Sequence, residues 1–139
     1  MSPEENRAIA RRYIEQVWNK GDLDQFEEFI AADAIPHSSP AIKNRDDMKN
    51  GLVMIRNAFP DLSFTIEDDI AADDKVIQRW TISGTHRGEM LGVAATGKQA
   101  VWSGISILRL AGGKIAEYWV QNDTLGLMQQ LGAMPAPGG

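Results

Sequence analysis

Hydrophobic residues recur at helical spacing through the first part of the chain. Residues 2–20 begin with the letters SPEE, in which the serine suits a helix cap, the proline suits the first helical position and the second glutamate falls three residues after the cap. Apolar positions then repeat every three to four residues from Ile9 to Trp18, and Gly21 follows the segment. This pattern predicts an amphipathic helix with one buried stripe.

Two further segments repeat the helical pattern. Residues 22–33 carry it briefly, and residues 45–62 carry it until Pro60 ends the helix. The intervening residues 34–44 hold two prolines and two serines, so we expect an extended, irregular crossing there. The first 62 residues therefore predict three helices.

After the third helix the hydrophobic period changes from about 3.6 to 2, which indicates strands. Four strands of an antiparallel meander are expected, at residues 62–71, 75–86, 99–110 and 114–123. A short helix at residues 123–132 closes the pattern. Helices grouped ahead of strands predict an α+β fold in which the helices cover one face of a curved sheet.

Bulk composition excludes several classes of protein. With 139 residues, 43% of them hydrophobic and 24% charged, we expect one domain over residues 1–139 and a flexible tail at 134–139. The formal charge of -5 comes with no basic stripe, so no nucleic-acid partner is expected. No apolar run approaches the roughly 20 residues of a membrane span, so we expect no membrane partner and a cytoplasmic location.

Recognisable metal and cofactor motifs are missing from the sequence. There is no cysteine, and the two histidines lack the close spacing of a helical metal motif, so no metal site is expected. The glycine-containing residues 88–99 lack the Gly-Lys-Ser/Thr of a phosphate loop, and no dinucleotide fingerprint is present. We therefore expect chemistry without a cofactor, or binding alone.

Asp123, at the end of the last predicted strand, is the foremost candidate for chemistry. Simple alternation places Ile115, Glu117, Trp119, Gln121 and Asp123 on one face of that strand. Asp123 could serve only as the cap of the helix that follows, where aspartate is favoured. Alternatively, a carboxyl group beside Trp119 would face whatever the sheet encloses and could act as a general acid or base. Both interpretations stay open from the residues alone.

The two histidines are further candidates for the site. His86 lies at the far end of the second strand, on the same alternation as Trp80 if the strand runs unbroken, and His37 lies in the irregular crossing. Each could be an ordinary loop residue, or could assist Asp123 by donating a hydrogen bond to an oxyanion. Gln121 and Asn122 are further candidate donors. Gln121 is the better of the two, because alternation places it on the face of Asp123 and Asn122 on the opposite face.

Large hydrophobic residues could line a ligand pocket or simply form the core. Aromatic side chains on a concave sheet suit a flat, unsaturated ligand, and methionine on a helix suits an adaptable wall. By contrast, Arg79 and Arg109 are most simply exposed cations of their strands. The candidate substrate-binding residues are Trp119, Gln121, Trp80, Tyr13, Trp18, Met54, Ile55 and Phe59.

Several short motifs of the strand region occur together in one family. They are Gly-Thr-His-x-Gly at 84–88, Thr-Gly-Lys at 96–98, Gly-Lys-Ile at 113–115 and Trp-x-x-x-Asp at 119–123. With these motifs the chain resembles the SnoaL-like polyketide cyclase family, also called ester cyclases, of the nuclear transport factor two-like superfamily. The likeness covers nearly the whole chain and is strongest from Phe59 to Gly132.

The resemblance implies a cone, in which three N-terminal helices roof a strongly bent antiparallel sheet of four to six strands around an apolar pocket. It also implies a homodimer formed through the outer face of the sheet. In characterised cyclases of this kind an aspartate on a late strand acts as acid and base in an aldol ring closure, without metal or cofactor. Asp123 matches that position.

Three functional hypotheses follow. The first is a cofactor-independent cyclase or isomerase that acts on a hydrophobic carbonyl substrate with Asp123 as its acid and base. The second is a noncatalytic small-molecule binding protein on the same cone, because one fold can support either function. The third is a hydrolase or a ketosteroid-type isomerase. An epoxide hydrolase would need two acids bridged by an arginine in the cavity.

Overall fold

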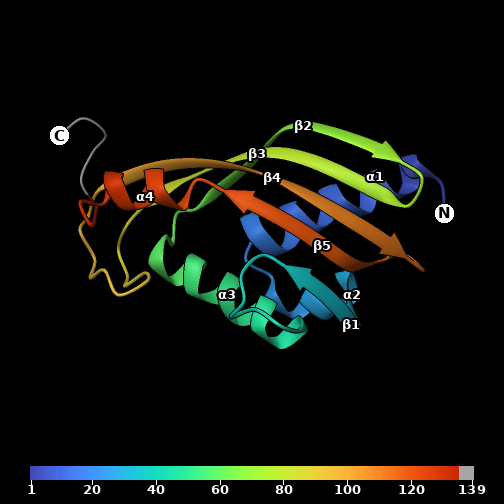
Figure 1. The fold of residues 1–139 in the computed structure, drawn as a ribbon, viewed down its shortest axis with the longest axis horizontal. Helices are drawn as coiled ribbons and strands as arrows, with labels where there is room; N and C mark the ends of the chain where they lie inside the picture. The colour runs from blue at the N-terminus through green and yellow to red at the C-terminus, as the bar shows by residue number, and fades with distance from the viewer. Residues whose placement is uncertain (135–139) are drawn as a thin grey trace.

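The computed structural model of the protein describes residues 1–134 as a curved sheet with helices on its concave side (Figure 1). The expected tail at 134–139 lies outside these residues apart from Met134. Along the chain the elements are α1 (Pro3–Tyr13), the π-helix η1 (Ile14–Asn19), the 3-10 helix η2 (Leu23–Gln25), α2 (Phe26–Phe29), β1 (Ile30–His37), α3 (Arg45–Ala58), β2 (Ser63–Ala72), β3 (Lys75–Thr85), β4 (Gln99–Ala111), β5 (Lys114–Asn122) and α4 (Thr124–Gln130).

The predicted α+β class and the curved sheet are confirmed, with five strands in the order β1-β5-β4-β3-β2. Strands β2 to β5 form the expected antiparallel meander. The expectation of a wholly antiparallel sheet is wrong, because β1 pairs with β5 in parallel. Residues 30–37 were expected to be the end of a helix and an irregular crossing. They form an edge strand instead, and an edge strand tolerates Pro36 because one side of it needs no ladder hydrogen bond.

The first helix begins as its sequence predicts. The Ser2 hydroxyl accepts a hydrogen bond from the backbone N–H of Glu5, and the Glu5 carboxylate accepts one from the backbone N–H of Ser2. The helix then widens into the π-helix η1, which ends at Asn19. The Asn19 amide bonds both the N–H and the C=O of Phe64 on the edge strand β2, so η1 fixes the helical layer to the sheet.

A β-bulge in β5 determines which of its side chains face the helices. Ile115 pairs with Leu110 and Glu117 pairs with Arg109, so the intervening Ala116 has no partner on β4. One extra residue moves every later side chain to the opposite face. The predicted shared face of Ile115 with Trp119 is therefore wrong.

The hydrophobic core fills the space between the helices and the concave face of the sheet. At the far end of the sheet, α4 packs against β4. Its Gln130 side chain accepts a hydrogen bond from the backbone N–H of Val101 and donates one to the carbonyl of the same residue. Within residues 1–134, no helix is long and apolar enough to cross a membrane.

Candidate functional site

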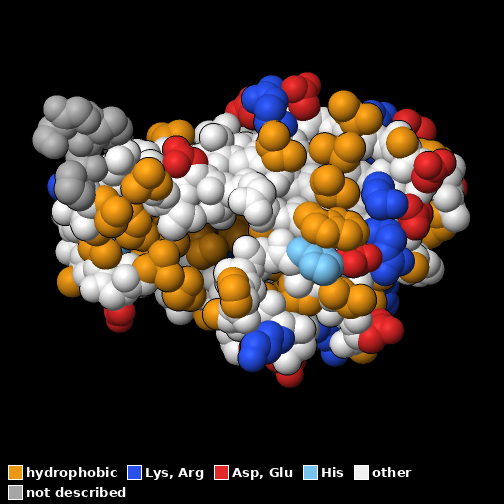
Figure 2. Space-filling model, in the orientation of Figure 1, with side chains coloured by type: hydrophobic (Ala, Val, Ile, Leu, Met, Phe, Trp, Pro, Cys, Tyr) orange, Lys and Arg blue, Asp and Glu red, His pale blue; other side chains and the backbone are white. Residues whose placement is uncertain are grey.

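A cavity of about 210 Å³ lies between the concave face of the sheet and the helices α1, η1 and α3. Figure 2 shows the surface hollowed between the end of β5 and α3, with hydrophobic side chains at the bottom of the hollow. Every strand contributes to the lining. The lining residues are Tyr13, Ile14, Trp18, Ile30, Ser38, Ile42, Met48, Gly51, Leu52, Met54, Ile55, Phe64, Gln78, Trp80, Ile82, Trp102, Ser106, Leu108, Ile115, Tyr118, Val120 and Asn122.

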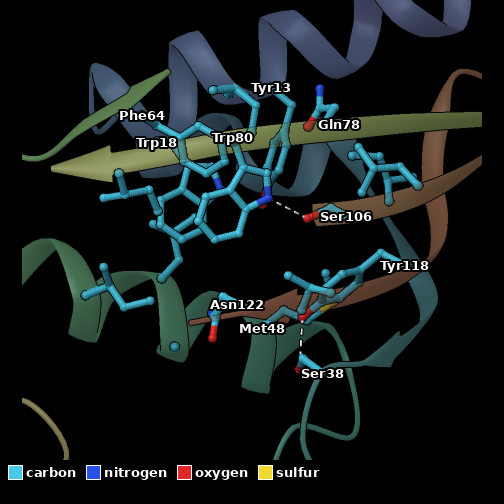
Figure 3. A pocket seen from close by; sticks show the side chains of 18 of the residues that line it. Tyr13, Trp18, Ser38, Met48, Phe64, Gln78, Trp80, Ser106, Tyr118 and Asn122 are labelled. Carbon is cyan, nitrogen blue, oxygen red and sulfur yellow. Dashed lines mark hydrogen bonds between the residues drawn. The ribbon is translucent and has the colours of Figure 1, made fainter. Parts of the chain in front are cut away.

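Two walls of different chemistry face each other across this cavity (Figure 3). On one side, the ring centroids of Trp18 and Phe64 are 5.3 Å apart, and those of Phe64 and Trp80 are 5.1 Å apart. On the other side, α3 presents aliphatic and thioether side chains such as Met48 and Leu52. A space between an aromatic wall and an aliphatic wall suits a flat, apolar ligand.

Gly104 makes room for the aromatic wall. It lies opposite Trp80 on β4, and a Cβ atom at this position would fall 2.4 Å from Cζ2 of the Trp80 indole. The indole Nε1–H donates a hydrogen bond of 2.9 Å to Oγ of Ser106. The indole is therefore held in one position by a close backbone approach and a hydrogen bond.

The polar groups of the lining are neutral, since none of the lining side chains within residues 1–134 is Asp, Glu, Lys, Arg or His. Two of them are phenols: burial raises the pKa of Tyr13 and, less strongly, the pKa of Tyr118. Both phenols therefore stay protonated near neutral pH and can donate hydrogen bonds. The Tyr118 hydroxyl donates one to Oγ of Ser38 at 3.4 Å. Such a lining can bind the oxygens of an uncharged ligand.

Asp123 is exposed and forms the N-cap of α4. Its Oδ1 accepts a hydrogen bond of 2.8 Å from the backbone N–H of Gly126, which confirms the capping role. The expected placement beside Trp119 inside the sheet is wrong, because the bulge in β5 turns that row of side chains outward. The residue before it, Asn122, does line the cavity. Asp123 therefore lies next to the cavity lining without being part of it.

The two histidines lie in separate places, and neither lines the cavity. His86 is fully buried, and its Nδ1 bonds the hydroxyl of Thr96 at 3.0 Å and accepts from the N–H of the same residue at 3.2 Å. It fixes the loop between β3 and β4. His37 stacks on Trp119 with 5.0 Å between ring centroids. Its Nε2 lies 2.8 Å from the Glu117 carboxylate on the outer face. The structure does not bring the three catalytic candidates together.

The predicted binding residues divide into two groups. Five of them line the cavity, namely Tyr13, Trp18, Met54, Ile55 and Trp80. Three others do not. Trp119 and Gln121 lie on the outer face, and Phe59 packs between His86 and Trp102 with ring centroids 5.4 and 4.9 Å away. The cavity therefore lies between the helices and the sheet, among five of the predicted residues. Two of the three residues that do not line it belong to the last strand, β5.

The sequence model of the family described as SnoaL-like polyketide cyclase matches residues 8–131. The chain belongs to this family. Two aklanonic acid methyl ester cyclases are similar to this SnoaL-like protein. DnrD of Streptomyces peucetius is 26% identical over 138 residues, covering 94% of each chain, and DauD of Streptomyces sp. (strain C5) is 27% identical over 146 residues, covering 100% of this chain and 88% of its own.

Solved structures share the fold. TsrD from Streptomyces laurentii superposes with a TM-score of 0.87 at 26% identity, covering 96% of this chain and 99% of its own. AclR from Streptomyces galilaeus, a proposed hydroxylase, gives a TM-score of 0.89 at 30% identity, covering 97% of this chain and 85% of its own. The family and the cone fold that the sequence motifs implied are confirmed for this SnoaL-like protein.

Several polar residues of the cavity are not among the predicted substrate-binding residues. Gln78 and Ser106 lie on the inward alternation of β3 and β4 with Trp80 and Leu108, so the strand period could have identified them. Simple alternation assigned Tyr118 and Asn122 to the face away from the cavity, but both line it. Both residues follow the bulge in β5, which the sequence does not predict. Among residues 1–134 no group of three acidic or histidine side chains is placed to hold a metal ion.

Proposed function

We propose that this SnoaL-like protein is a cofactor-independent cyclase that closes a ring in a flat, hydrophobic carbonyl ester by an aldol-type reaction. The observation that supports this most is the cavity itself, which combines an aromatic wall with neutral hydrogen-bonding groups. Its curated relatives are cyclases of aklanonic acid methyl ester, an ester substrate. A neutral lining fits such an uncharged substrate, because no buried charge is left without a partner.

Ring closure needs two proton steps. A base removes a proton from the carbon α to a carbonyl, the resulting enolate attacks a second carbonyl, and the new alkoxide takes up a proton. We propose Asp123 as the group that removes the first proton and returns it to the alkoxide. The carboxylate lies beside Asn122 of the lining, and its bond from Gly126 leaves further acceptor capacity.

Asn122 is the proposed donor to the enolate oxygen. Its amide lines the cavity, whereas Gln121, the donor expected from the sequence, lies on the outer face. A neutral amide stabilises an oxyanion by a hydrogen bond that is already in place when the charge develops. His37 and His86 have no part in this mechanism. His37 stacks on Trp119 and bonds Glu117 on the outer face, and His86 is fully buried against Thr96.

Conversion of aklanonic acid methyl ester tests the function. We expect the wild-type protein to convert it into a cyclic product of the same mass, because an aldol closure neither adds nor removes atoms. Ile55→Trp, which fills the cavity from α3, should remove both ligand binding and conversion. Ile70→Trp adds the same indole on the exposed outer face and should leave both unchanged. Conversion that survives Ile55→Trp would show that the cavity is not the site.

A noncatalytic binding protein is the second candidate function. Among the described residues that line the cavity there is no carboxylate or histidine, which favours this candidate because the proton steps then depend on Asp123 alone. Ligand affinity that depends on Ile55 with no conversion of the ester would favour this alternative. An epoxide hydrolase has no such support. Arg79 and Arg109, the candidate bridging cations, lie on the outer face and bond Asp68 and Glu117.

We also propose that the protein is a homodimer formed through the outer face of the sheet. Hydrophobic side chains form a continuous row there across four strands, and Figure 2 shows hydrophobic side chains in a line that ends beside a histidine. The last residue of the row, Trp119, is paired with His37 of β1. The row consists of Ile70, Ile77, Ile107 and Trp119, which are paired one with the next. A contiguous exposed apolar row on a sheet is typical of an interface.

A further inference from the structure

Gln78 is a buried polar residue to which the proposed chemistry gives no role. It lies on the inner face of β3, lines the cavity and is only 1% exposed. Its amide nitrogen has no hydrogen-bond partner among the described residues. A buried N–H without a partner is rare in folded proteins because it costs stability. This cost suggests that a group from outside the chain completes the site.

Neighbouring side chains do not satisfy this amide. On one side Gln78 pairs with Asp69 of β2, whose two carboxylate oxygens bind Arg11. On the other side it pairs with Ser106 of β4. The Ser106 oxygen already accepts the indole N–H of Trp80, so its hydroxyl proton remains to be donated. The Gln78 amide and the Ser106 hydroxyl therefore lie side by side on one face of the sheet, since directly paired residues have Cβ atoms about 5 Å apart.

We infer that Gln78 and Ser106 form a subsite that binds one carbonyl oxygen of the ligand at the inner end of the cavity. A carbonyl oxygen has two lone pairs and can accept from both the Ser106 hydroxyl and the Gln78 amide. A half-turn of the amide exchanges its nitrogen and oxygen with almost no change of shape, which brings the nitrogen to the ligand. The oxygen that replaces it tolerates the lack of a partner better than an N–H does.

The subsite also fixes the direction in which a ligand enters. Figure 3 shows Gln78 and Ser106 on one side of the cavity and Asn122 on another. Gln78 is buried, whereas Asn122 is exposed and next to Asp123. A flat ligand whose carbonyl is held by Gln78 therefore presents its opposite end to Asn122. This inference rests on the proposed function, because it takes the same cavity as the ligand site.

A pair of small ligands tests the subsite without any turnover. 1-Tetralone and tetralin share a bicyclic carbon skeleton and differ by one ketone oxygen. Their binding to the wild-type protein can be followed by the fluorescence of Trp18, Trp80 and Trp102, which all line the cavity. Gln78→Met keeps the length of the side chain and removes its hydrogen bonds. We expect it to weaken 1-tetralone binding roughly two- to tenfold and to leave tetralin binding unchanged.

Two controls separate the subsite from a general change of the cavity. Leu108→Met changes the shape of the lining without changing its polarity, and should alter the affinities for both ligands by the same factor. Gln78→Met should also raise the Tm of the free protein, because it removes an unpartnered buried amide. If Gln78 destabilises the free protein and strengthens ketone binding, its role is to bind the ligand and not to stabilise the fold.

The results that would overturn the inference are distinct from failure of the proposed function. An unchanged preference for 1-tetralone in Gln78→Met, or an equal loss for both ligands, would refute the subsite alone. A fall in the Tm of that variant would also refute it, because the amide would then be held by a structural water. Failure of the wild-type protein to bind either ligand would contradict the proposed function as well.

Discussion

Arg11 and Asp69 form the ion pair that joins α1 to β2. The guanidinium donates two hydrogen bonds to the carboxylate, from Nε at 2.5 Å and from Nη2 at 2.6 Å. The Asp69 side chain is 5% exposed and that of Arg11 is 54% exposed, so water screens the pair from one side only. The hydrogen bonds from Arg11 hold the pKa of Asp69 below its ordinary value. The contribution of this pair to the free energy of unfolding therefore depends on pH.

Asp69→Asn should lower the free energy of unfolding by about 1 kcal/mol at pH 7. Because the pKa of Asp69 is lower in the folded than in the unfolded chain, its contribution is complete above the unfolded value of about 3.9. It disappears as the pH falls through the folded value. Urea unfolding of the wild type and the variant between pH 7 and pH 2 measures this.

Asp68→Asn is the matched control, since Asp68 is 67% exposed and pairs with an exposed Arg79. We expect it to change the free energy of unfolding by no more than a few tenths of a kcal/mol at any pH. A pH-independent difference between the wild type and Asp69→Asn would contradict the linkage.

At the residue scale, local sequence predicts caps well and strand faces less well. The hydrogen bonds of Ser2 and of Asp123 follow from neighbours within three positions, which the sequence displays. The face of Trp119 depends on Ala116, which the pairing of β5 with β4 leaves without a partner. The residue type at position 116 does not predict a bulge, because alanine also occurs in regular strands.

At the scale of elements, one side chain of α4 makes the hydrogen bonds to the sheet edge that a neighbouring strand would make. Strand β5 ends at Asn122, opposite Gly104, so the start of β4 has no partner strand on that side. The Gln130 amide occupies this edge and bonds both backbone groups of Val101, at 2.9 and 2.7 Å. This amide therefore adds to the burial of Leu127 and Met128 in holding α4 to the sheet.

Gln130→Leu should loosen α4 without unfolding the sheet. The two backbone groups of Val101 can then bond water, so we expect a loss of about 1 kcal/mol in the free energy of unfolding. Hydrogen exchange should become faster at Val101 and in residues 124–131. Leu125→Gln, a change at an exposed position of the same helix, should leave both unchanged. Equal protection of α4 in all three proteins would show that Gln130 does not anchor it.

Element types with a strong period were predictable, and one element was not. The three helical segments and the four-strand meander follow from hydrophobic spacing. Strand β1 lacks a clear alternation, because only Ile30, Ala34 and Pro36 of its eight residues are buried. Its conformation comes from pairing with β5, which lies about 80 positions away in the sequence.

At the scale of the whole molecule, the outer face of the sheet exposes several large hydrophobic side chains. Exposed fractions are 61% for Ile70, 50% for Ile105 and 55% for Val101. Charged groups border this surface, among them Glu117, whose pKa is held below its usual range by His37 and Arg109. A hydrophobic centre with a charged rim is the usual composition of an interface.

We expect a dimeric mass for the wild-type protein in light scattering coupled to gel filtration. The double variant Ile77→Lys, Ile105→Lys places two like charges in the hydrophobic surface and should give the monomer, because a buried lysine without a partner is costly. Leu91→Lys introduces a lysine on an exposed loop residue and should remain dimeric. A monomeric wild type would contradict the dimer through this face.

The most direct test of the account is the single-turnover rate of ring closure in wild type and Asp123→Asn. Asparagine caps a helix as well as aspartate does, so the variant keeps the bond from Gly126 and loses only its capacity to carry the proton. We predict a rate lower by roughly 100-fold or more, the contribution typical of a general acid or base. Asp33→Asn, at an exposed carboxylate of β1, should keep the wild-type rate. An unchanged rate in Asp123→Asn would contradict the mechanism.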